Sequence, residues 1–423
     1  MDKEEQLKSL FDDNRKFGCV MFDLQEQANG KMAPMPGSGW ASIEGGAAYR
    51  IKNTGDLSHE VKWITNLEKE IFWKLGIAKQ ERFKHSGYMR TDIGQIMKEL
   101  GLTPPKVAIT LVCQNISSIF TKVMKLAKEF YGVNSFTKKD LQSEIKETLF
   151  AMDTSISTPV DEALSRAYQD LVICELPVLK ERMNFVTLKR PRYFHAKSIL
   201  DVSIPTWDGD WDFLGMSDLP TNTADKLKFL MEQEKPFIAK VAIHSFSHPE
   251  NINVDLSKLL NLGEAIGEGG KAKQRNWVCQ PELLYLSKFA NLDIEAAFVA
   301  NGYQELEKKI QLPYLGELSD FSYSLGLLSE CVWTGLASRS INQKTNHKTV
   351  VSPRACWLKA ADRFMTLTSA MMLSSAGFIV NSYGYGGVNV VVEDAKLSHL
   401  IEIAPHAGLS VPISIIEKHQ FLF

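Results

Sequence analysis

Three consecutive runs of apolar residues at helical spacing, within residues 115–171, constrain the fold of this chain more than any other feature. The first run follows Asn115, a residue type that caps helices, and ends at Gly132, since glycine can close a helix in the left-handed conformation. The second run covers residues 138–149, and the third begins at Pro159, because proline suits the first turn of a helix. The pattern predicts a subdomain of three short helices.

The segment after these helices is apolar and then basic. Residues 171–178 and 185–188 have the composition of short strands. Between Lys180 and Lys197 six Lys/Arg residues stand against one acid, Glu181. A hairpin with this charge can reach the phosphates beside a groove of a duplex. We therefore expect a basic β-hairpin after the third helix.

In this order, three helices and a basic hairpin resemble a winged helix-turn-helix. The resemblance implies that the third helix enters the major groove, which accepts a helix about 10–12 Å wide, and that residues 172–197 form the wing. The alternative is a helical subdomain with an ordinary hairpin and a solvated basic tip. The residues expected to contact nucleic acid here are Ser165, Arg166, Gln169, Lys189, Arg190, Arg192 and Lys197.

A second segment, residues 91–107, resembles a helix-turn-helix with Gly101 at the turn. The same signals mark any hairpin of two helices in a bundle. Two such units in tandem resemble replication-initiator or partition-type proteins of plasmids and phages. The order of the segments implies a DNA-binding N-terminal half.

Two further segments combine cations with features that suit nucleic acid. Residues 263–275 form a glycine-rich loop whose N–H groups could hold a phosphate backbone, and residues 338–363 interleave cations with Trp357, as single-strand binding requires. The alternative in both cases is a solvated surface loop. The candidate contact residues are Lys271, Lys273, Arg275, Arg339, Lys344, Lys348 and Arg354.

Catalytic and metal-binding signals are weak. Asp208, Asp210 and Asp212 lie within five residues and could bind a hard cation, but the sequence favours a solvated acidic loop with two anchoring Trp residues. His244 and His248 have a metal-ligand spacing, but they follow a strand-like run, which does not align them. No motif of a known catalytic class is present. We therefore expect no cofactor, no metal and no catalytic residue.

The composition excludes several classes of protein. The net charge of −2 gives no global positive field, so nucleic-acid binding must depend on local patches. Six cysteines without a C-x-x-C pair fit neither a zinc ribbon nor a disulfide-stabilised secreted module. The longest apolar stretch, residues 364–380, is broken by Thr, Ser and Gly. We expect a cytoplasmic protein with no membrane partner.

The domain organisation predicted from these patterns has four parts. Residues 1–45 form an N-terminal arm, because residues 31–39 are rich in Pro and Gly. A helical, winged-helix-like nucleic-acid-binding region follows, in which residues 57–76 form the first helix, and then a linker and a mixed domain close the chain. The predicted parts are residues 1–45, 46–200, 201–224 and 225–423. The fold class is α+β, helix-rich, with a mixed C-terminal half that ends in a β-hairpin at 378–392.

The function predicted from the sequence is that of a non-enzymatic nucleic-acid-binding protein, with DNA favoured, similar to a replication initiator or regulator. One alternative is a viral nucleoprotein or virion assembly protein. It would bind single-stranded RNA or DNA through the basic segments and form a homo-oligomer through the arm at 1–45. The other alternative is a metal-dependent phosphodiester enzyme that uses the acids at 208–212.

Overall fold

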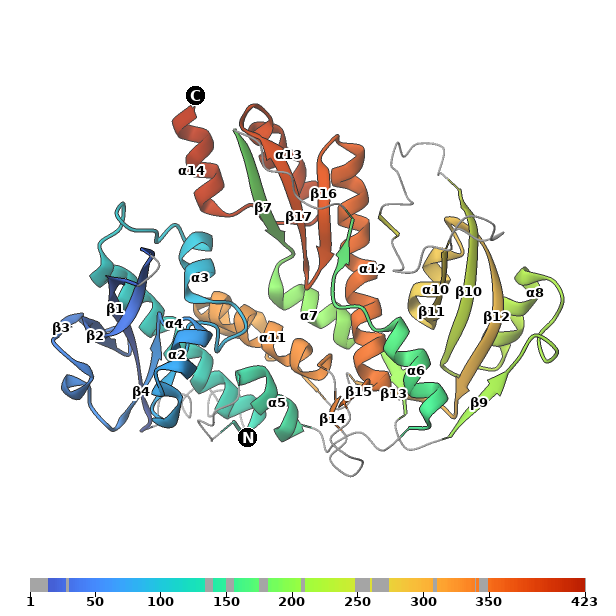
Figure 1. Ribbon diagram of the computed structural model, residues 1–423, viewed down its shortest axis with the longest axis horizontal. Helices are drawn as coiled ribbons and strands as arrows, with labels where there is room; N and C mark the ends of the chain where they lie inside the picture. Colours follow the sequence, from blue (N-terminus) through green and yellow to red (C-terminus); the bar gives the residue numbers. More distant parts are fainter. Residues whose placement is uncertain are drawn as a thin grey trace. The chain divides into compact units, whose positions relative to one another are not determined.

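The computed structural model describes residues 14–27, 30–133, 140–149, 156–174, 182–206, 210–247, 259–260, 274–306, 310–338, 340–341 and 349–422 (Figure 1). The chain divides into two compact units, each made of three chain segments. Unit 1 comprises Met1–Ala151, Leu312–Gly335 and Pro412–Glu417, and unit 2 comprises Met152–Gln311, Leu336–Val411 and Lys418–Phe423. The predicted α+β class is confirmed, while the predicted domain boundaries differ from these two units.

Unit 1 is built on a five-stranded sheet with the strand order β3-β2-β1-β4-β5. Its strands are β1 (Lys16–Glu26), β2 (Met32–Ile43), β3 (Tyr49–Ile51), β4 (Val61–Thr65) and β5 (Phe83–Lys84). The central strand β1 pairs antiparallel with β2 and parallel with β4. Its run Phe17–Phe22 is buried, because β1 has a strand on each side and a helix across one face.

These strands correct two predictions for the N-terminal region. The expected arm at 1–45 is wrong for residues 16–43, which form β1 and β2 within the sheet of unit 1 rather than a hook for a neighbouring molecule. Pro34 is tolerated because this part of β2 has a partner strand on one side only. The helix expected at 57–76 is in fact β4 followed by a short helix, since the run from Val61 is rich in β-branched and aromatic residues.

The helices of unit 1 cover the sheet and the loops at its edge. They are α2 (Lys69–Lys74), α3 (Ile93–Glu99), α4 (Ile109–Tyr131) and α5 (Leu141–Leu149), with the 3-10 helices η1 (Thr54–Asp56), η2 (Ile77–Lys79) and η3 (Leu315–Phe321). Helices α11 (Ser322–Leu336) and α14 (Ile413–Leu422) begin in this unit. Helix α4 packs on β1 and β2, with the Phe17 and Phe120 rings edge to face at 5.7 Å.

Helix α4 ends as predicted and begins earlier than predicted. Gly132 closes it with a left-handed φ of 65°, but the helix begins at Ile109, and Asn115 lies inside it rather than at its N-cap. The turn before α4 needs a glycine, since Gly101 has a φ of 66° and an added Cβ would lie 3.1 Å from the Ile413 side chain. The segment 91–107 therefore contains one helix and a turn, and the next helix follows only at Ile109.

Unit 2 contains two four-stranded sheets, with the strand orders β11-β10-β12-β9 and β6-β16-β17-β7. The strands of the first are β9 (Trp211–Leu214), β10 (Phe237–Phe246), β11 (Gln274–Cys279) and β12 (Ala290–Ala300). Those of the second are β6 (Val172–Ile173), β7 (Met183–Lys189), β16 (Ile379–Gly384) and β17 (Gly387–Glu393). Two short pairs complete the strands: β8 (Ser203–Pro205) with β13 (Tyr303–Glu305), and β14 (Ser340–Ile341) with β15 (Thr349–Val350). The predicted hairpin at 378–392 is confirmed as β16 and β17.

The helices of unit 2 include one long, buried helix, α12, that lies along β16 (Figure 1). They are α6 (Thr158–Ala167), α7 (Arg192–Leu200), α8 (Thr223–Glu232), α10 (Gln280–Leu286), α12 (Pro353–Ser375) and α13 (Leu397–His406), with the 3-10 helix η4 (Asp394–Lys396). Helix α12 is capped at its N-terminus by Ser352, whose hydroxyl accepts a hydrogen bond from the backbone N–H of Ala355. Among the described residues, no helix is both long enough and apolar enough to span a membrane.

The strands of the expected wing do not form a hairpin. Strands β6 and β7 lie at opposite edges of their sheet, because β16 and β17 stand between them. The end of the expected wing, residues 192–197, belongs to helix α7. In addition, α4 and α5 belong to unit 1 and α6 to unit 2. Val172–Ile173 of the first apolar run and the run at 185–188 pair with C-terminal strands that are about 200 residues away in the sequence, a distance that local patterns do not reveal.

Candidate functional site

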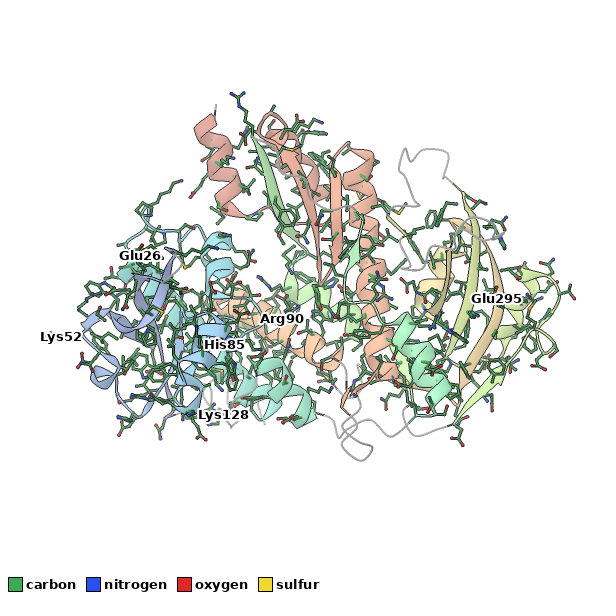
Figure 2. All side chains as sticks on the ribbon, viewed as in Figure 1. Glu26, Lys52, His85, Arg90, Lys128 and Glu295 are labelled. Carbon is green, nitrogen blue, oxygen red and sulfur yellow. The ribbon has the colours of Figure 1, made fainter. Side chains whose placement is uncertain are left out.

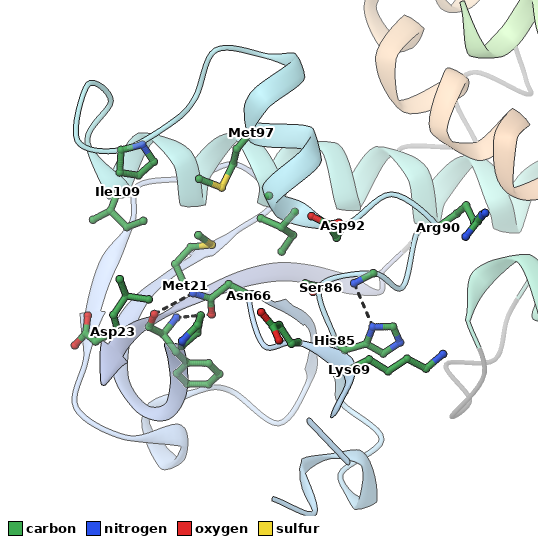
Figure 3. A pocket seen from close by; sticks show the side chains of 18 of the residues that line it. Met21, Asp23, Asn66, Lys69, His85, Ser86, Arg90, Asp92, Met97 and Ile109 are labelled. Atoms are coloured by element: carbon green, nitrogen blue, oxygen red, sulfur yellow. Dashed lines mark hydrogen bonds between the residues drawn. The ribbon is translucent and has the colours of Figure 1, made fainter. Parts of the chain in front are cut away.

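The candidate functional site is a pocket of about 880 Å³ in unit 1, next to the second half of β1 (Figure 3). Its apolar lining comes from strands β1 and β2, helix α3 and the turn before α4. The apolar residues are Met21, Phe22, Leu24, Pro34, Ile93, Met97, Pro104 and Ile109. The polar lining residues include Asp23, Asn66, Glu68, Lys69, His85, Ser86, Arg90, Asp92, Asp140 and Gln142.

A side-chain clamp shapes the wall of the pocket at β1. The Asn66 side chain accepts a hydrogen bond from the Phe22 N–H at 2.9 Å and donates one to the Phe22 carbonyl at 3.0 Å. The register of β1 against β2 shifts between Phe22 and Leu24, where Asp23 alone lies opposite residues 35–38 of β2. The irregularity therefore lies in β2, and β1 continues without an inserted residue. Asp23, the residue after the one that Asn66 holds, lies in the lining of the pocket.

Asp23 is paired with a cation from the neighbouring strand. Arg50 on β3 donates through Nη1 to Oδ1 at 2.8 Å and through Nη2 to Oδ2, and the Ser38 hydroxyl adds a third hydrogen bond. These contacts, that of Arg50 first, hold the pKa of Asp23 below its ordinary value. The Arg50 guanidinium also lies over the Trp40 ring, 5.6 Å from its centroid. The carboxylate of Asp23 therefore already has a fixed counter-ion.

A second paired carboxylate, Asp140, lies beside Lys69 and His85. His85 Nε2 is 2.8 Å from Asp140 Oδ1, and Lys69 Nζ is 3.0 Å from Oδ2. Burial acts to raise the pKa of Asp140, but the hydrogen bonds of His85 and Lys69 outweigh it, so the pKa lies below its ordinary value.

The ring nitrogens of His85 are both in use. Nδ1 accepts a hydrogen bond from the Gly87 N–H at 3.1 Å, so Nε2 carries the proton that it donates to Asp140 (Figure 3). The imidazole therefore orients Asp140 and is not placed to act as a general base. In Figure 3 Asp23 lies at the left end of the pocket, and Lys69, His85 and Arg90 lie at the right end.

Arg90 reaches the pocket from a strained backbone position. It has a φ of 70°, in the left-handed region that is uncommon for residues other than glycine, and its N–H donates to the Gly87 carbonyl at 3.1 Å. Strained residues of this kind cluster at functional sites. The strain keeps Arg90 at the end of the pocket where Lys69 and His85 lie.

A buried ionic cluster supports this end of the pocket. Lys84 on β5 lies 3.8 Å from Glu144 on α5, and the Tyr88 hydroxyl donates to the same carboxylate at 3.2 Å. Burial lowers the pKa of Lys84 to about 8, against the attraction of Glu144 and Asp140. The cluster joins β5 to α5, and His85 and Asp140 are the neighbouring residues on these two segments. It therefore fixes the distance between His85 and Asp140.

The carboxylates of the pocket do not form a metal-ligand set. Within the residues that the structure describes, no three His, Cys, Asp or Glu side chains converge as ligands of one ion. Of the three acids at 208–212, Asp212 is exposed on β9 and Asp210 precedes that strand, while Asp208 lies outside the described residues.

The residues expected on a recognition helix lie on α6 and just after it. Ser165 and Arg166 are exposed, and Leu164 and Ala167 are buried, which matches the expected faces. However, α6 ends at Ala167, so Gln169 is not on the same helix as Arg166. The Gln169 carbonyl accepts a hydrogen bond from Arg363 of α12. The backbone of Gln169 is therefore held by α12, and a contact of its side chain with nucleic acid stays a prediction.

The basic residues of the expected wing hold the turn between β16 and β17. Lys189 Nζ donates to the Tyr385 carbonyl at 2.8 Å, and the Arg190 N–H donates to the Gly386 carbonyl at 2.7 Å. Arg190 Nη1 also donates to the Met365 carbonyl at 3.1 Å. The wing assignment is therefore wrong for Lys189 and Arg190. Arg192 begins α7 and Lys197 is exposed on it.

The expected basic belt at 338–363 is largely internal where the structure describes it. Arg354 is 1% exposed and its Nε donates to the Leu336 carbonyl at 3.1 Å, so a nucleic-acid contact for Arg354 is wrong. Arg275 lies in β11, and its side chain is outside the description. Five other candidates lie outside the described residues: Lys271, Lys273, Arg339, Lys344 and Lys348.

Sequence reasoning named no residue of the pocket as a site residue, although the segment 91–107, expected to be a helix-turn-helix, supplies Asp92, Ile93, Gly94, Met97 and Pro104 to its lining. A signal for it was present, because the apolar run Phe17–Phe22 ends in Asp23 and a second apolar run ends in Asn66. Two buried strands that end in polar residues often bring those residues to one edge of a sheet. The reading of residues 1–45 as an arm hid this pattern.

No protein-family model matches the chain, and no curated protein matches it. Among solved structures, the chain is similar to Phi29 DNA polymerase complexed with primer-template DNA, with 10% sequence identity and a TM-score of 0.49. This similarity covers 89% of this chain and 80% of the polymerase chain. The same polymerase complexed with single-stranded DNA gives 10% identity and a TM-score of 0.48 over the same shares of both chains.

These similarities contradict two predictions made from the sequence. The chain was expected to be a non-enzymatic DNA-binding regulator or, as the first alternative, a nucleoprotein, and it was expected not to be an enzyme. The solved structures to which it is similar are those of a DNA polymerase, which is an enzyme. Neither non-enzymatic function is retained for this chain.

Proposed function

We propose that the pocket of unit 1 binds one nucleotide unit of a single-stranded nucleic acid. The observation that carries this proposal is the division of the pocket into an apolar wall and a polar side, in which two cations, Lys69 and Arg90, lie at the same end. The polar side also holds four carboxylates, those of Asp23, Glu68, Asp92 and Asp140. A nucleotide has the same division, into a flat base and an anionic phosphate. Single-strand sites in proteins combine a surface for the base with cations for the backbone.

The apolar wall suits a nucleobase of any identity. Met21, Ile93, Met97 and Ile109 line it, and methionine side chains adapt their shape to a flat partner. The volume of about 880 Å³ lies within the range of about 300–1,000 Å³ that is typical of small-ligand pockets. The wall offers few hydrogen bonds, because the Asn66 amide is already bonded to Phe22. It therefore favours binding without base specificity.

The polar side suits a phosphate. The Lys69 side chain is 58% exposed and its ammonium group donates one hydrogen bond to Asp140, so the remaining hydrogens of this group can face a ligand. Arg90 lies at the same end of the pocket (Figure 3). A phosphate between these two cations would leave the base on the side of Met97.

The proposal is tested by fluorescence anisotropy with a fluorescein-labelled oligothymidylate and the full chain. Lys69→Gln should weaken binding by about tenfold, because a hydrogen bond to a charged group is lost. It should also reduce the magnitude of the salt slope by about 0.7, the value for one phosphate contact on a single strand. The matched control is Lys52→Gln, an exposed lysine of the same unit that lies away from His85 and Arg90 (Figure 2).

Competition with thymidine monophosphate distinguishes a strand from a free nucleotide. If a strand is the ligand, the monophosphate displaces the probe only at a much higher concentration than an unlabelled oligothymidylate does. Equal losses of affinity in Lys69→Gln and Lys52→Gln, or no binding of the probe at low salt, would contradict the proposal.

A further inference from the structure

We propose that Arg50 and Lys69 are the resident cations of this pocket, which neutralise Asp23 and Asp140 so that an anionic strand binds without a divalent metal ion. The inference rests on the proposed function for its ligand and concerns the electrostatics of the same site. It assigns a role to Arg50, which does not line the pocket itself.

The pairing of Asp23 with Arg50 has the geometry of a permanent counter-ion. Both guanidinium nitrogens face both carboxylate oxygens, and such bidentate pairs are stronger and more directional than single contacts. The Trp40 ring under the guanidinium fixes the position of Arg50, and the Ser38 hydroxyl occupies a further acceptor site of the carboxylate. These three donors use three of the about four lone-pair sites of the carboxylate, so a metal ion would compete with a fixed cation for this group.

The pairing of Asp140 follows the same principle with different donors. Lys69 contributes a full charge to Oδ2, and His85 contributes a neutral N–H to Oδ1. Each oxygen of Asp140 therefore has a donor within 3.0 Å. As at Asp23, a metal ion would compete with groups that the fold already holds in place.

The two paired carboxylates do not share a location where one ion could bridge them. Asp23 lies at the left end of the pocket in Figure 3, and Lys69 and His85, the partners of Asp140, lie at the right end. Hard cations such as Mg²⁺ and Mn²⁺ bind where several oxygen ligands converge. Asp23 and Asp140 are thus each neutralised by a cation, Glu68 and Asp92 are the other carboxylates of the lining, and the described residues lack the converging oxygens that a metal requires.

The first arm of the test measures metal binding without any nucleic acid. Binding of Mn²⁺ is followed by the electron paramagnetic resonance signal of the aqueous ion, for the unaltered chain and for the double variant Asp23→Asn/Asp140→Asn. We expect the same weak background in both. A Mn²⁺ ion that the unaltered chain binds and the double variant does not would overturn the inference, whether or not a strand binds.

The second arm measures oligothymidylate binding at low salt in the presence of EDTA. The unaltered chain should bind equally with EDTA and with Mg²⁺. Arg50→Ala should weaken binding by about threefold to tenfold, because it exposes the charge of Asp23 to the strand. Arg50→Lys should bind like the unaltered chain, since the charge is retained.

The decisive comparison is Arg50→Ala/Asp23→Asn. If Arg50 acts as a counter-ion, removing both charges restores binding to within about twofold of the unaltered chain. If Arg50 contacts the strand itself, the double variant binds as weakly as Arg50→Ala, and the inference is wrong. If no variant binds the strand, the proposed function fails, while the Mn²⁺ arm still decides whether Arg50 and Lys69 exclude a metal.

Discussion

The carboxylates of the two units show how depth changes the role of the same kind of charge pair. In unit 1, Asp23 is 34% exposed and is paired with Arg50 at the edge of a pocket. In unit 2, Asp362 of α12 is fully buried and accepts hydrogen bonds from His195 Nε2 at 2.8 Å and from the N–H groups of Tyr385 and Gly386 at 2.7 and 2.8 Å.

The comparison shows that the Asp23–Arg50 pair sets the charge at the edge of a pocket, whereas Asp362 and its donors stabilise the packing of unit 2. Water can solvate Asp23 if its partner leaves, so this pair contributes little to stability. Asp362 has no water to replace its partners, and its donors come from α7 and from the turn between β16 and β17. That turn has left-handed backbone at Tyr385, with a φ of 50°, and its N–H groups point at one carboxylate.

The largest effect should separate these two carboxylates directly. Asp362→Ala should lower the free energy of unfolding by about 3–5 kcal/mol, because it leaves His195 and two backbone N–H groups buried without an acceptor. Asp23→Ala, the matched control, should lower it by less than about 1 kcal/mol. Urea denaturation monitored by circular dichroism measures both. Similar losses of unfolding free energy in Asp362→Ala and Asp23→Ala would contradict the conclusion that only the buried carboxylate stabilises the fold.

The direction in which the pKa of Asp362 is shifted predicts how the stability of unit 2 depends on pH. Burial acts to raise the pKa of Asp362, but His195, Lys359 and the Gly386 N–H hold it below the ordinary value of 3.8. A carboxyl group whose pKa is lowered by folding stabilises the fold above its unfolded pKa, and this stabilisation is lost as the pH falls through the folded pKa. Acid unfolding of unit 2 should therefore lose this dependence in Asp362→Asn.

An effect of intermediate size tests whether the burial of a charged group, rather than the unit in which it lies, determines its contribution to the free energy of unfolding. Lys84 is a buried cation in unit 1, and burial lowers its pKa to about 8. The unfolded state, with an ordinary pKa of about 10.4, binds this proton more tightly than the folded state does. The free energy of unfolding should therefore rise by about 2 kcal/mol from pH 7.5 to pH 9.5.

Urea denaturation across this pH range, compared with Lys84→Met, measures the effect. The rise should be absent in Lys84→Met, and Lys52→Met serves as an exposed control that keeps it. A rise of the same size in Lys84→Met would assign it to another group and would show that Lys84 is not the depth-sensitive charge of unit 1.

The smallest effect concerns an exposed charge of unit 2. Arg166 lies on the solvent side of α6, opposite the buried Leu164. Arg166→Ala should change the free energy of unfolding by less than about 0.5 kcal/mol, whereas Leu164→Ala should lower it by about 2–5 kcal/mol through the cavity that it creates. Thermal unfolding of both variants provides the measurement. If Arg166→Ala lowered the free energy of unfolding by more than about 1 kcal/mol, Arg166 would contribute to stability as the buried charged residues do.

Local signals in the sequence predicted several elements correctly. The end of α4 at Gly132, the proline in the first turn of α6 and the hairpin around residues 384–387 follow from a left-handed glycine, a residue suited to a helix start and a glycine-rich turn. Each of these signals acts within a few residues. Pairing over long separations has no such signal, so β6 and β7 were assigned to each other, while in the structure each pairs with a C-terminal strand.

The site was predicted less well than the fold, because the sequence does not show whether a charged residue is buried or exposed. Lys359 and Arg363 stand in a basic run, yet both are 2% exposed, since Asp170 and Glu282 from other segments neutralise them. In the pocket the reverse holds. Asp23 and Asp140 are far apart in the sequence, and only the fold of unit 1 brings both into one lining.

The interleaving of the two units has a consequence for synthesis on the ribosome. Unit 1 needs the segments 312–335 and 412–417, and their contacts with it include the 2.7 Å hydrogen bond from the Tyr323 hydroxyl to Glu99 and the packing of Ile413 beside Gly101. The first 151 residues therefore emerge long before the segments that complete their packing, and all of unit 2 except its last residues is made in between. At translation rates of about 5–20 residues per second, the sheet of unit 1, whose five strands all lie within the first 151 residues, waits for at least about ten seconds for the helical segments that complete the packing of the unit, and chaperones have that interval in which to bind its exposed apolar surface.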